Sequence, residues 1–180
     1  MYQNAVTNAG QEAAGDGRKI VHGSTFDLWC LDTANAFAGY FSGCAKVSVG
    51  SVIVDREGKI LGAGANRAIP DKCKSEGCLR IKKYGEASKD HRLPSDCRAI
   101  HSEVDAISRV AKSCFSTRNC TIYVTRYPCE ACARTIVAAG IKRVLYGRKQ
   151  EVSDETLEIF KSGGVFVARV DNWDEEDTTV

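Results

Sequence analysis

The chain has 180 residues, a length that suits one domain or one domain carrying an insertion. Its composition, 43% hydrophobic and 27% charged, is ordinary for a soluble globular protein, and its formal net charge of +2 is too small to favour a non-specific nucleic-acid binder. No apolar run approaches the ~18 residues that a membrane-spanning helix needs, so no membrane partner is expected.

Nine cysteines are many for this length, and their odd number argues against a complete set of disulfides. The N-terminal stretch has no basic start followed by an apolar core, so we expect no secretory signal and a reducing, cytoplasmic location. Metal ligation then explains some of the cysteines better than disulfides do. Four others lie in apolar or strand-like contexts and are expected to be small buried residues: Cys30, Cys44, Cys114 and Cys120.

The N-terminal part of the chain is expected to be flexible over residues 1–23. Apolar residues at helical spacing then predict a helix over residues 25–41. Ser24 and Thr25 are candidates for its N-cap, because a hydroxyl oxygen there accepts a hydrogen bond from an unpaired amide of the first turn.

A β-hairpin is predicted next. The stretch 47–55 is rich in β-branched residues, Glu57 and Gly58 form a turn signal, and 59–65 predicts the returning strand. Residues 66–97 differ, because they hold two of the three prolines, several glycines and many charges. We interpret them as an insertion or long loop, which is typical of a functional segment or of one ordered by a metal.

Helices and strands alternate after this insertion. Helices are expected over 101–113, 128–140 and 153–164, and strands over 121–127, 141–147 and 165–170. The order of elements predicts an α/β sandwich in which helices cover a mixed sheet. Residues 24–170 would form a single domain, followed by an acidic tail over 171–180.

The segment PCEAC, residues 128–132, carries the most specific signal in the chain. A CxxC pair by itself is weak, because it also occurs in zinc fingers and in redox proteins. Here, however, His101, Ser102 and Glu103 stand at the start of the preceding helix. The combination of H-x-E with a later P-C-x-x-C is a signature of zinc-dependent nucleobase deaminases.

The chemistry of such a site can be assigned to particular residues. Zinc needs about four tetrahedral ligands, and a catalytic site keeps one position open. His101, Cys129 and Cys132 would supply three ligands from the first turns of two helices, where the unpaired amides favour thiolates. Glu103 would be the catalytic acid–base group that takes a proton from water and delivers it to the base. A helix-capping role is the alternative for Glu103.

Several stretches resemble the cytidine deaminase superfamily, and within it the deoxycytidylate (dCMP) deaminases. VGSVIV is similar to that family's VGAVIV strand, HSEVDAI to its HAE-x-NAI helix, and YVTRYPCEACARTIVAAGIKRVLY to its zinc helix and following strand. The resemblance implies a cytidine-deaminase-like three-layer sandwich with a five-stranded mixed sheet flanked by helices. It also implies one catalytic zinc, a nucleoside monophosphate substrate and an oligomer, often a hexamer.

Some residues depart from the family pattern. Ser102 stands where the family has alanine, Asp105 where it has asparagine, and Arg126 where it usually has leucine. The loop GANR lacks the tyrosine and the second glycine of the family loop. In relatives that loop lies beside the nucleotide and a regulatory dCTP site, so dCTP and dTTP are candidate regulators whose action the altered loop puts in question.

Three residues near these motifs are candidate substrate contacts. Asn66 matches the asparagine of the family loop and could contact a sugar or phosphate, with a turn-forming role as the alternative. Arg126 could reach a phosphate or face solvent. Tyr127 could pack on the base or belong to the core.

A second, structural zinc is predicted in the insertion. Cys73 and Cys78 bracket a short turn-forming spacer, and His91 and Cys97 follow in the same polar stretch. The segment has few apolar residues to bury, so a metal could order it where packing cannot. Some dCMP deaminases carry a structural zinc in this region. A carboxylate or water could replace His91, and free thiols are the alternative for the whole cluster.

The sequence therefore predicts a zinc hydrolase that converts dCMP, or a 5-modified dCMP, to the uracil nucleotide and ammonia, supplying dUMP for thymidylate synthesis. Close alternatives change the substrate to tRNA adenosine or to a free nucleoside or base. A non-catalytic, zinc-stabilised assembly protein is an alternative from another class, but structural zinc needs no carboxylate such as Glu103. Apolar surface on the first helix and on a GIKRVLY edge strand predicts a homo-oligomer.

Overall fold

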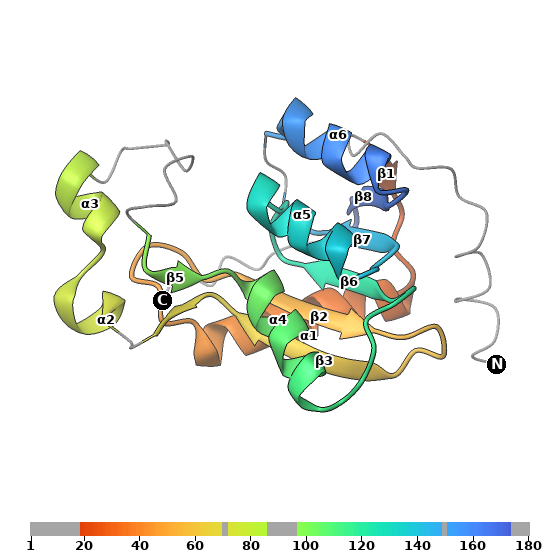
Figure 1. Ribbon diagram of the computed structural model, residues 1–180, viewed down its shortest axis with the longest axis horizontal. Helices are drawn as coiled ribbons and strands as arrows, with labels where there is room; N and C mark the ends of the chain where they lie inside the picture. Colours follow the sequence, from red (N-terminus) through yellow and green to blue (C-terminus); the bar gives the residue numbers. More distant parts are fainter. Residues whose placement is uncertain (1–18, 70–71, 86–96, 149–150, 174–180) are drawn as a thin grey trace.

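A mixed six-stranded sheet forms the centre of the computed structural model, which describes residues 19–69, 72–85, 97–148 and 151–173. β2 is antiparallel to both of its neighbours, and the other pairs are parallel (Figure 1). Across the sheet the strands are β1 (Ile20–Val21), β8 (Phe166–Val170), β7 (Arg143–Tyr146), β6 (Thr121–Val124), β2 (Gly50–Val54) and β3 (Ile60–Ala65).

The predicted α/β sandwich is confirmed, with one strand more than the five expected. The additional strand is β1, which lies inside the segment expected to be a flexible lead-in. Ile20 pairs with Arg169 and Val21 with Val170, both in parallel register. Strand patterning needs about four alternating residues to be recognised, so a two-residue strand has no signature in the sequence.

Helix α1 (Thr25–Phe41) covers one face of the sheet. It begins where the sequence predicts, because the Ser24 hydroxyl accepts a hydrogen bond from the Asp27 amide while the Asp27 carboxylate accepts one from the Ser24 amide. The buried residues between this helix and the sheet form one cluster: Cys30, Leu31, Ala34, Val52, Val54, Tyr123, Leu145, Phe166, Ala168, Val170 and Trp173.

Helices α4 (Ser102–Lys112), α5 (Glu130–Ala138) and α6 (Asp154–Ser162) cover the opposite face (Figure 1). The strands alternate strictly between the two layers. Ile122 and Val144 lie side by side in register and face these three helices, whereas the next residues, Tyr123 and Leu145, face α1. Because helices cover both faces of the sheet, the sequences of the central strands are continuous apolar runs.

Gly64 brings α4 onto the sheet. A Cβ atom at Gly64 in β3 would lie 2.3 Å from both the Ala106 amide nitrogen and the Ser102 carbonyl oxygen. Only a residue without a side chain permits this approach. The close contact fixes the N-terminus of α4, and with it His101 and Glu103, against the sheet.

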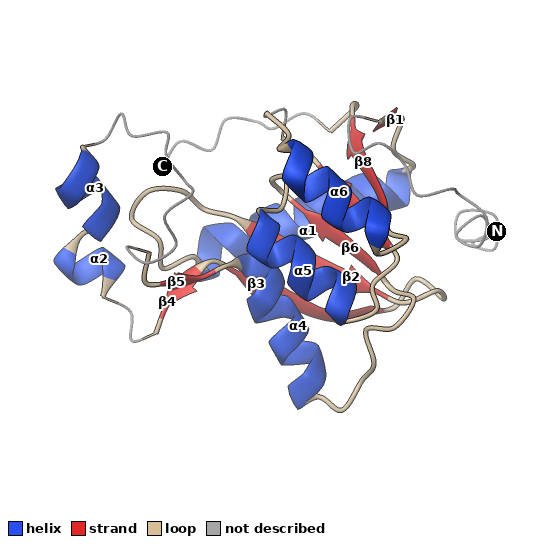
Figure 2. Ribbon diagram, turned by 45° about the horizontal axis from the view of Figure 1, so that its top comes forward, coloured by secondary structure: helices blue, strands red, loops and turns tan. Residues whose placement is uncertain are grey.

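The predicted insertion contains short elements rather than a loop alone. It leaves the sheet through β4 (Arg67–Ala68), continues into α2 (Cys73–Glu76) and α3 (Leu79–Tyr84), and returns through β5 (Ala99–Ile100), which pairs with β4. Figure 2 shows α2 and α3 beside the sandwich rather than over the sheet. Among the described residues of α3 none is buried, which agrees with the prediction that packing contributes little here.

The C-terminal end of the described chain packs against α1. Trp173, inside the predicted acidic tail, is 8% exposed and donates a hydrogen bond from its ring nitrogen to the Asp32 carboxylate at 2.8 Å. Residues 174–180 of that tail, residues 1–18 of the predicted lead-in and His91 lie outside the described residues. None of the described helices is both long and apolar enough to cross a membrane.

Candidate metal centre

Two helix N-termini meet at a group of three potential ligands. Cys129 is the N-cap residue of α5, and Cys132 lies in the first turn of that helix. His101 is the N-cap residue of α4. His101 Nδ1 lies 3.4 Å from Cys129 Sγ and 3.3 Å from Cys132 Sγ, and the three atoms all lie within 4.8 Å of one another.

The positions of His101 and Cys129 differ slightly from those predicted. The sequence places both in the first turn of a helix, whereas the structure makes both N-caps with extended backbone, at φ −74° and −77°. Neither side chain makes a capping hydrogen bond to its own helix. The imidazole and the thiol therefore stay available to a ligand, beside the unpaired amides of the first turn.

The three side chains are coupled electrostatically. Hydrogen bonds with Cys132 and then His101 lower the pKa of Cys129 to about 4. Hydrogen bonds with Cys129 and then Cys97 raise the pKa of His101 to about 11. A hydrogen bond with Cys129, followed by burial, raises the pKa of Cys132. This arrangement favours an electron-rich sulfur beside a protonated imidazole, whose proton a cation can replace.

The donor set fits zinc. Two sulfurs and one imidazole nitrogen are ligands that zinc prefers, and three protein ligands leave a fourth position for water or substrate, as in catalytic sites. A structural site would have four protein ligands. Cys132 is 1% exposed but Cys129 is exposed, so the group is accessible from one side.

Glu103 is buried beside this group. It lies two residues after His101, is 4% exposed, and is close enough to Cys132 to raise the pKa of that thiol. The Ser102 hydroxyl donates to Glu103 Oε2 at 3.1 Å. Burial raises the pKa of the Glu103 carboxyl, while the charge of His101 acts in the opposite direction. A buried carboxyl of raised pKa next to an open metal position is suited to exchanging protons with water.

Asn66 is largely occupied by contacts within the protein. Its side-chain oxygen accepts hydrogen bonds from the Ser42 hydroxyl and the Val49 amide, each at 2.8 Å, and its side-chain nitrogen donates to the Val47 carbonyl at 2.8 Å. The amide of asparagine carries two N–H bonds, so the contacts of the described residues leave one of them for a ligand. The side chain thus holds its own loop in place.

Arg126 and Tyr127 occupy different environments, although they are neighbours in the sequence. Arg126 is partly exposed, and its buried Nε atom has no hydrogen-bond partner among the described residues. Tyr127 is 7% exposed and packs in the core, with its ring 4.9 Å from that of Tyr146 and 6.4 Å from that of Phe160. Core packing therefore covers most of the Tyr127 side chain, whereas the Arg126 guanidinium has one N–H group without a hydrogen-bond partner among the described residues.

An ion-pair cluster beside the candidate metal centre was not predicted from the sequence. Asp105 is 3% exposed, and it accepts hydrogen bonds from Arg67 at 2.8 Å and from Arg109 at 3.0 Å. Arg67 lies opposite Ile100 in the β4–β5 pair, so it is close to His101. Two departures from the family pattern, Asp105 and the arginine of GANR, therefore contact each other. Only the relative position of β4 and α4 reveals this.

The cysteines of the insertion lie in one neighbourhood but do not form a close ligand group. Burial, followed by the nearby Cys44, Cys78 and Cys97 thiols, raises the pKa of Cys73. Within the described part of the chain, no second group of three or more histidine, cysteine or acidic side chains is placed to hold a metal ion. A hydrogen bond with His101 is the largest influence on Cys97 and lowers its pKa. The sequence did not include Cys44 in this group.

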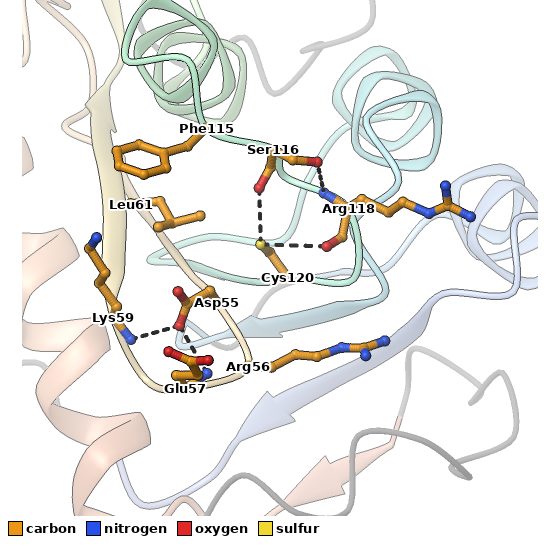
Figure 3. Close-up of a pocket in the computed structure, with 9 residues that line it drawn as sticks. All are labelled: Asp55, Arg56, Glu57, Lys59, Leu61, Phe115, Ser116, Arg118 and Cys120. Carbon is orange, nitrogen blue, oxygen red and sulfur yellow. Dashed lines mark hydrogen bonds between the residues drawn. The ribbon is translucent and has the colours of Figure 1, made fainter.

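A shallow hollow lies at the other end of α4. It is formed by the turn between β2 and β3 and by the segment that follows α4 (Figure 3). Asp55 accepts hydrogen bonds from the Glu57 and Lys59 amides at 2.9 Å, and the Lys59 ammonium lies 4.7 Å from the centre of the Phe115 ring. None of the predicted site residues lines this hollow.

Comparison with known proteins agrees with the geometry. The family described as the zinc-binding region of cytidine and deoxycytidylate deaminases matches residues 24–148. The chain is 36% identical over 132 residues to ComE operon protein 2 of Bacillus subtilis (strain 168), covering 72% of this chain and 64% of that protein. It is 36% identical over 121 residues to a deoxycytidylate deaminase of Mus musculus, covering 65% of this chain and 64% of that enzyme. The chain thus spans slightly less than two thirds of these relatives.

Solved structures share the fold. The dCMP deaminase of cyanophage S-TIM5 in its apo form matches with a TM-score of 0.61 at 22% identity, covering 82% of this chain and 99% of that one. The same phage enzyme in complex with dCMP and dUMP matches with a TM-score of 0.60 at 24% identity, covering 83% and 100%. The cytidine-deaminase-like architecture expected from the sequence is therefore confirmed.

Proposed function

The chain belongs to the cytidine and deoxycytidylate deaminase family, and on that premise we propose that it hydrolyses dCMP, or a 5-modified dCMP, to the uracil nucleotide and ammonia. The observation that carries the proposal is the buried Glu103 beside the group of His101, Cys129 and Cys132. The product of dCMP would be dUMP, the substrate for thymidylate synthesis. The residues from 24 to 170 would form the deaminase domain, with 66–97 as its insertion.

His101, Cys129 and Cys132 would hold the zinc ion. When bound, zinc supplies Lewis-acid chemistry and makes water a better nucleophile at neutral pH. The thiolate favoured at Cys129 could bind the cation directly, whereas the imidazole of His101 and the thiol of Cys132 would each release a proton as the cation binds. Because Cys132 is buried and Cys129 is exposed, the substrate would approach from the side of Cys129.

Glu103 would move the protons of the reaction. Its carboxylate takes one proton from water as the water oxygen bonds to C4 of cytosine, and passes this proton to the ring nitrogen N3. It then carries the second proton of that oxygen to the exocyclic nitrogen. The C4–N bond breaks, ammonia leaves and the C4 oxygen stays as the uracil carbonyl. The raised pKa of a buried carboxyl suits a group that must both accept and release protons.

Arg126 and Asn66 would bind the nucleotide. A buried guanidinium nitrogen that has no hydrogen-bond partner in the described part of the chain supports Arg126 as a phosphate contact, because a phosphate oxygen would satisfy it. The remaining N–H of Asn66 supports a contact to the sugar or phosphate. Tyr127 would contact the base only through the small part of its side chain that is exposed, since its ring packs in the core. dCTP and dTTP are the candidate regulators, to be tested by adding each at fixed dCMP.

A second, structural zinc would be held in the insertion by Cys73, Cys78 and Cys97, with His91 or Cys44 as the fourth ligand. The nearness of Cys44, Cys78 and Cys97 to Cys73 supports this grouping. Metal analysis tests it. Two zinc ions per chain that fall to one in Cys73→Ser, with deamination retained, are expected. One zinc ion per wild-type chain, lost in His101→Ala, would exclude the second site.

A substrate panel tests the assigned reaction. Ammonia release is measured with deoxycytidine, dCMP, 5-methyl-dCMP, dCTP, a free base and a tRNA containing the target adenosine. Turnover of dCMP, or of its 5-substituted form, is expected to exceed that of the nucleoside and the triphosphate. Fast turnover of deoxycytidine with none of dCMP would overturn the nucleotide assignment. Absence of turnover of every substrate by a zinc-loaded chain would favour a non-catalytic assembly protein.

A further inference from the structure

Two buried serine side chains are hydrogen-bonded in series to the Glu103 carboxylate. Ser51 belongs to β2 and Ser102 is the first residue of α4, and both are 0% exposed. Their hydroxyl oxygens are 2.7 Å apart, and the Ser102 hydroxyl donates to Glu103 Oε2 at 3.1 Å. An unbroken hydrogen-bonded chain therefore runs from the central sheet to the carboxylate.

The direction of this chain follows from the hydrogen bond at Glu103, in which the Ser102 hydroxyl is the donor. Each hydroxyl carries a single proton, so Ser51 must then donate to Ser102. A buried hydroxyl without a partner is costly, and here each serine supplies the partner that the other requires.

Both serines replace alanines of the family pattern. The motifs that this chain resembles read VGAVIV and HAE, whereas the chain reads VGSVIV and HSE. The two positions are 51 residues apart in the chain but adjacent in the fold. Two methyl groups at these places would pack without reaching Glu103. Two hydroxyls link the carboxylate to a rigid strand.

We propose that Ser102 is a positioning residue for Glu103 and that Ser51 orients the Ser102 hydroxyl. The inference rests on the proton-transfer role of Glu103 in the proposed function. By holding Oε2, Ser102 fixes the plane of the carboxylate and leaves Oε1 to exchange protons with water and base. Neither serine touches the substrate, so the effect is on the rate of the chemical step and not on binding.

A mutant cycle on dCMP deamination tests this positioning. The variants are Ser102→Ala, Ser51→Ala and the double variant, each assayed for kcat, KM, zinc per chain, thermal unfolding and the Kd of dUMP. Ser102→Ala is expected to lower kcat on the order of tenfold, the loss of one hydrogen bond to a charged group. KM, the Kd of dUMP and the zinc content should not change. Ser113→Ala, at an exposed serine that caps the other end of α4, is the matched control.

The effects of the two serines should not multiply. Because Ser51 acts only through Ser102, Ser51→Ala should lower kcat less, and the double variant should equal Ser102→Ala. Multiplicative losses, or a folded Ser102→Ala within twofold of wild-type kcat, would overturn the inference while the proposed function stands. If Ser102→Ala does not fold, a folded Ser51→Ala decides in its place: unchanged kcat overturns the inference. A wild-type chain that turns over no substrate refutes the proposed function itself.

Discussion

Arg126 has a buried guanidinium nitrogen that lacks a hydrogen-bond partner among the described residues, a feature that it shares with Arg67. It lies three positions before Cys129, where the resembled family usually has leucine, and its Nε atom is unsatisfied among the described residues. Such a donor is costly to bury unless something pairs with it. The phosphate of a nucleotide is the partner that the proposed reaction provides.

Arg126→Leu should therefore weaken the use of dCMP. We expect KM for dCMP to rise on the order of tenfold or more with a smaller change in kcat, since a phosphate contact contributes to binding away from the reacting atoms. KM for deoxycytidine, which has no phosphate, should stay the same. Steady-state kinetics on both substrates measure this, with Arg134→Leu as control because Arg134 is 64% exposed on α5. Equal changes for both substrates would contradict a phosphate contact.

The sequence alone predicts that four residues form one site, because each of their two motifs is local and the combination of both motifs is specific: His101, Glu103, Cys129 and Cys132. The structure then brings the three proposed ligands within 4.8 Å. The hydrogen bond of Ser51 with Ser102 cannot be predicted in this way. It joins residues 51 positions apart and depends on how closely α4 packs onto the sheet.

The absence of a side chain at Gly64 allows the N-terminus of α4 to pack directly on β3. Gly64→Ala would place a methyl group 2.3 Å from backbone atoms of Ser102 and Ala106, so helix and strand must separate. We expect a loss of about 3 kcal/mol or more in unfolding free energy, above the usual cost of overpacking, together with weaker zinc binding. Denaturant unfolding and metal titration measure both.

Gly39→Ala is the matched control for that substitution. Gly39 lies in α1, and a Cβ atom there would meet nothing within 4 Å. Alanine is the better helix former, so this variant should gain about 0.5–1 kcal/mol. If both variants changed stability alike, the close approach of α4 to β3 would not be what holds the metal centre.

The ion pair between Arg67 and Asp105 ties β4 to α4 and predicts a pH dependence. Burial alone would raise the pKa of Asp105, but hydrogen bonds from Arg67, the Ala65 amide and Arg109 outweigh it and lower the pKa below 3.8. A lowered folded-state pKa stabilises the protein above the unfolded-state value, and this stabilisation is lost as pH falls through the folded-state value.

Asp105→Asn should therefore destabilise the protein by about 1–3 kcal/mol at pH 7, as expected for hydrogen bonds to a buried charged group. The difference from wild type should be complete above about pH 5 and shrink below about pH 4. Urea unfolding at a series of pH values measures it, and the double variant with Arg67→Leu separates the ion pair from the other contacts. A difference that stays constant with pH would show that the carboxylate charge does not matter.

Elements with strong local signals were predictable, and elements made by tertiary contact were not. Helix α1 has helical periodicity and a capping box, so its bounds, Thr25–Phe41, could be predicted. Strands β1, β4 and β5 have two residues each, and each is a strand only because a neighbouring strand pairs with it. The short helices α2 and α3 were missed because they bury too few apolar residues to produce a periodic pattern.

Of the two surfaces predicted to form an oligomer, the first helix and the GIKRVLY strand, only the helix is available. The segment GIKRVLY is not an edge, because β7 lies between β6 and β8 and is buried. The first helix does leave apolar surface exposed: Trp29 at 50%, Tyr40 at 84% and Phe41 at 56%. The homo-oligomer, a hexamer by resemblance, therefore stays a prediction that rests on α1.

Sedimentation tests this prediction. We expect the wild type to sediment as an oligomer at micromolar concentration and Tyr40→Ser with Phe41→Ser to shift it towards the monomer, because exposed aromatic residues supply much of an interface's stability. The substitutions should leave the unfolding of the monomer nearly unchanged, since both side chains are more than half exposed. A wild-type chain that sediments as a monomer would contradict the assembly.

The proposed transfer of protons by Glu103 during deamination at the zinc centre can be tested with a single substitution. Ammonia release from dCMP is measured for wild type and Glu103→Gln at equal zinc per chain, with Glu158→Gln on the exposed side of α6 as control. The glutamine keeps the shape of the side chain but cannot take up a proton. We expect kcat to fall by about 10²–10⁴ in Glu103→Gln while the control matches wild type. Undiminished ammonia release by zinc-loaded Glu103→Gln would show that Glu103 does not transfer these protons.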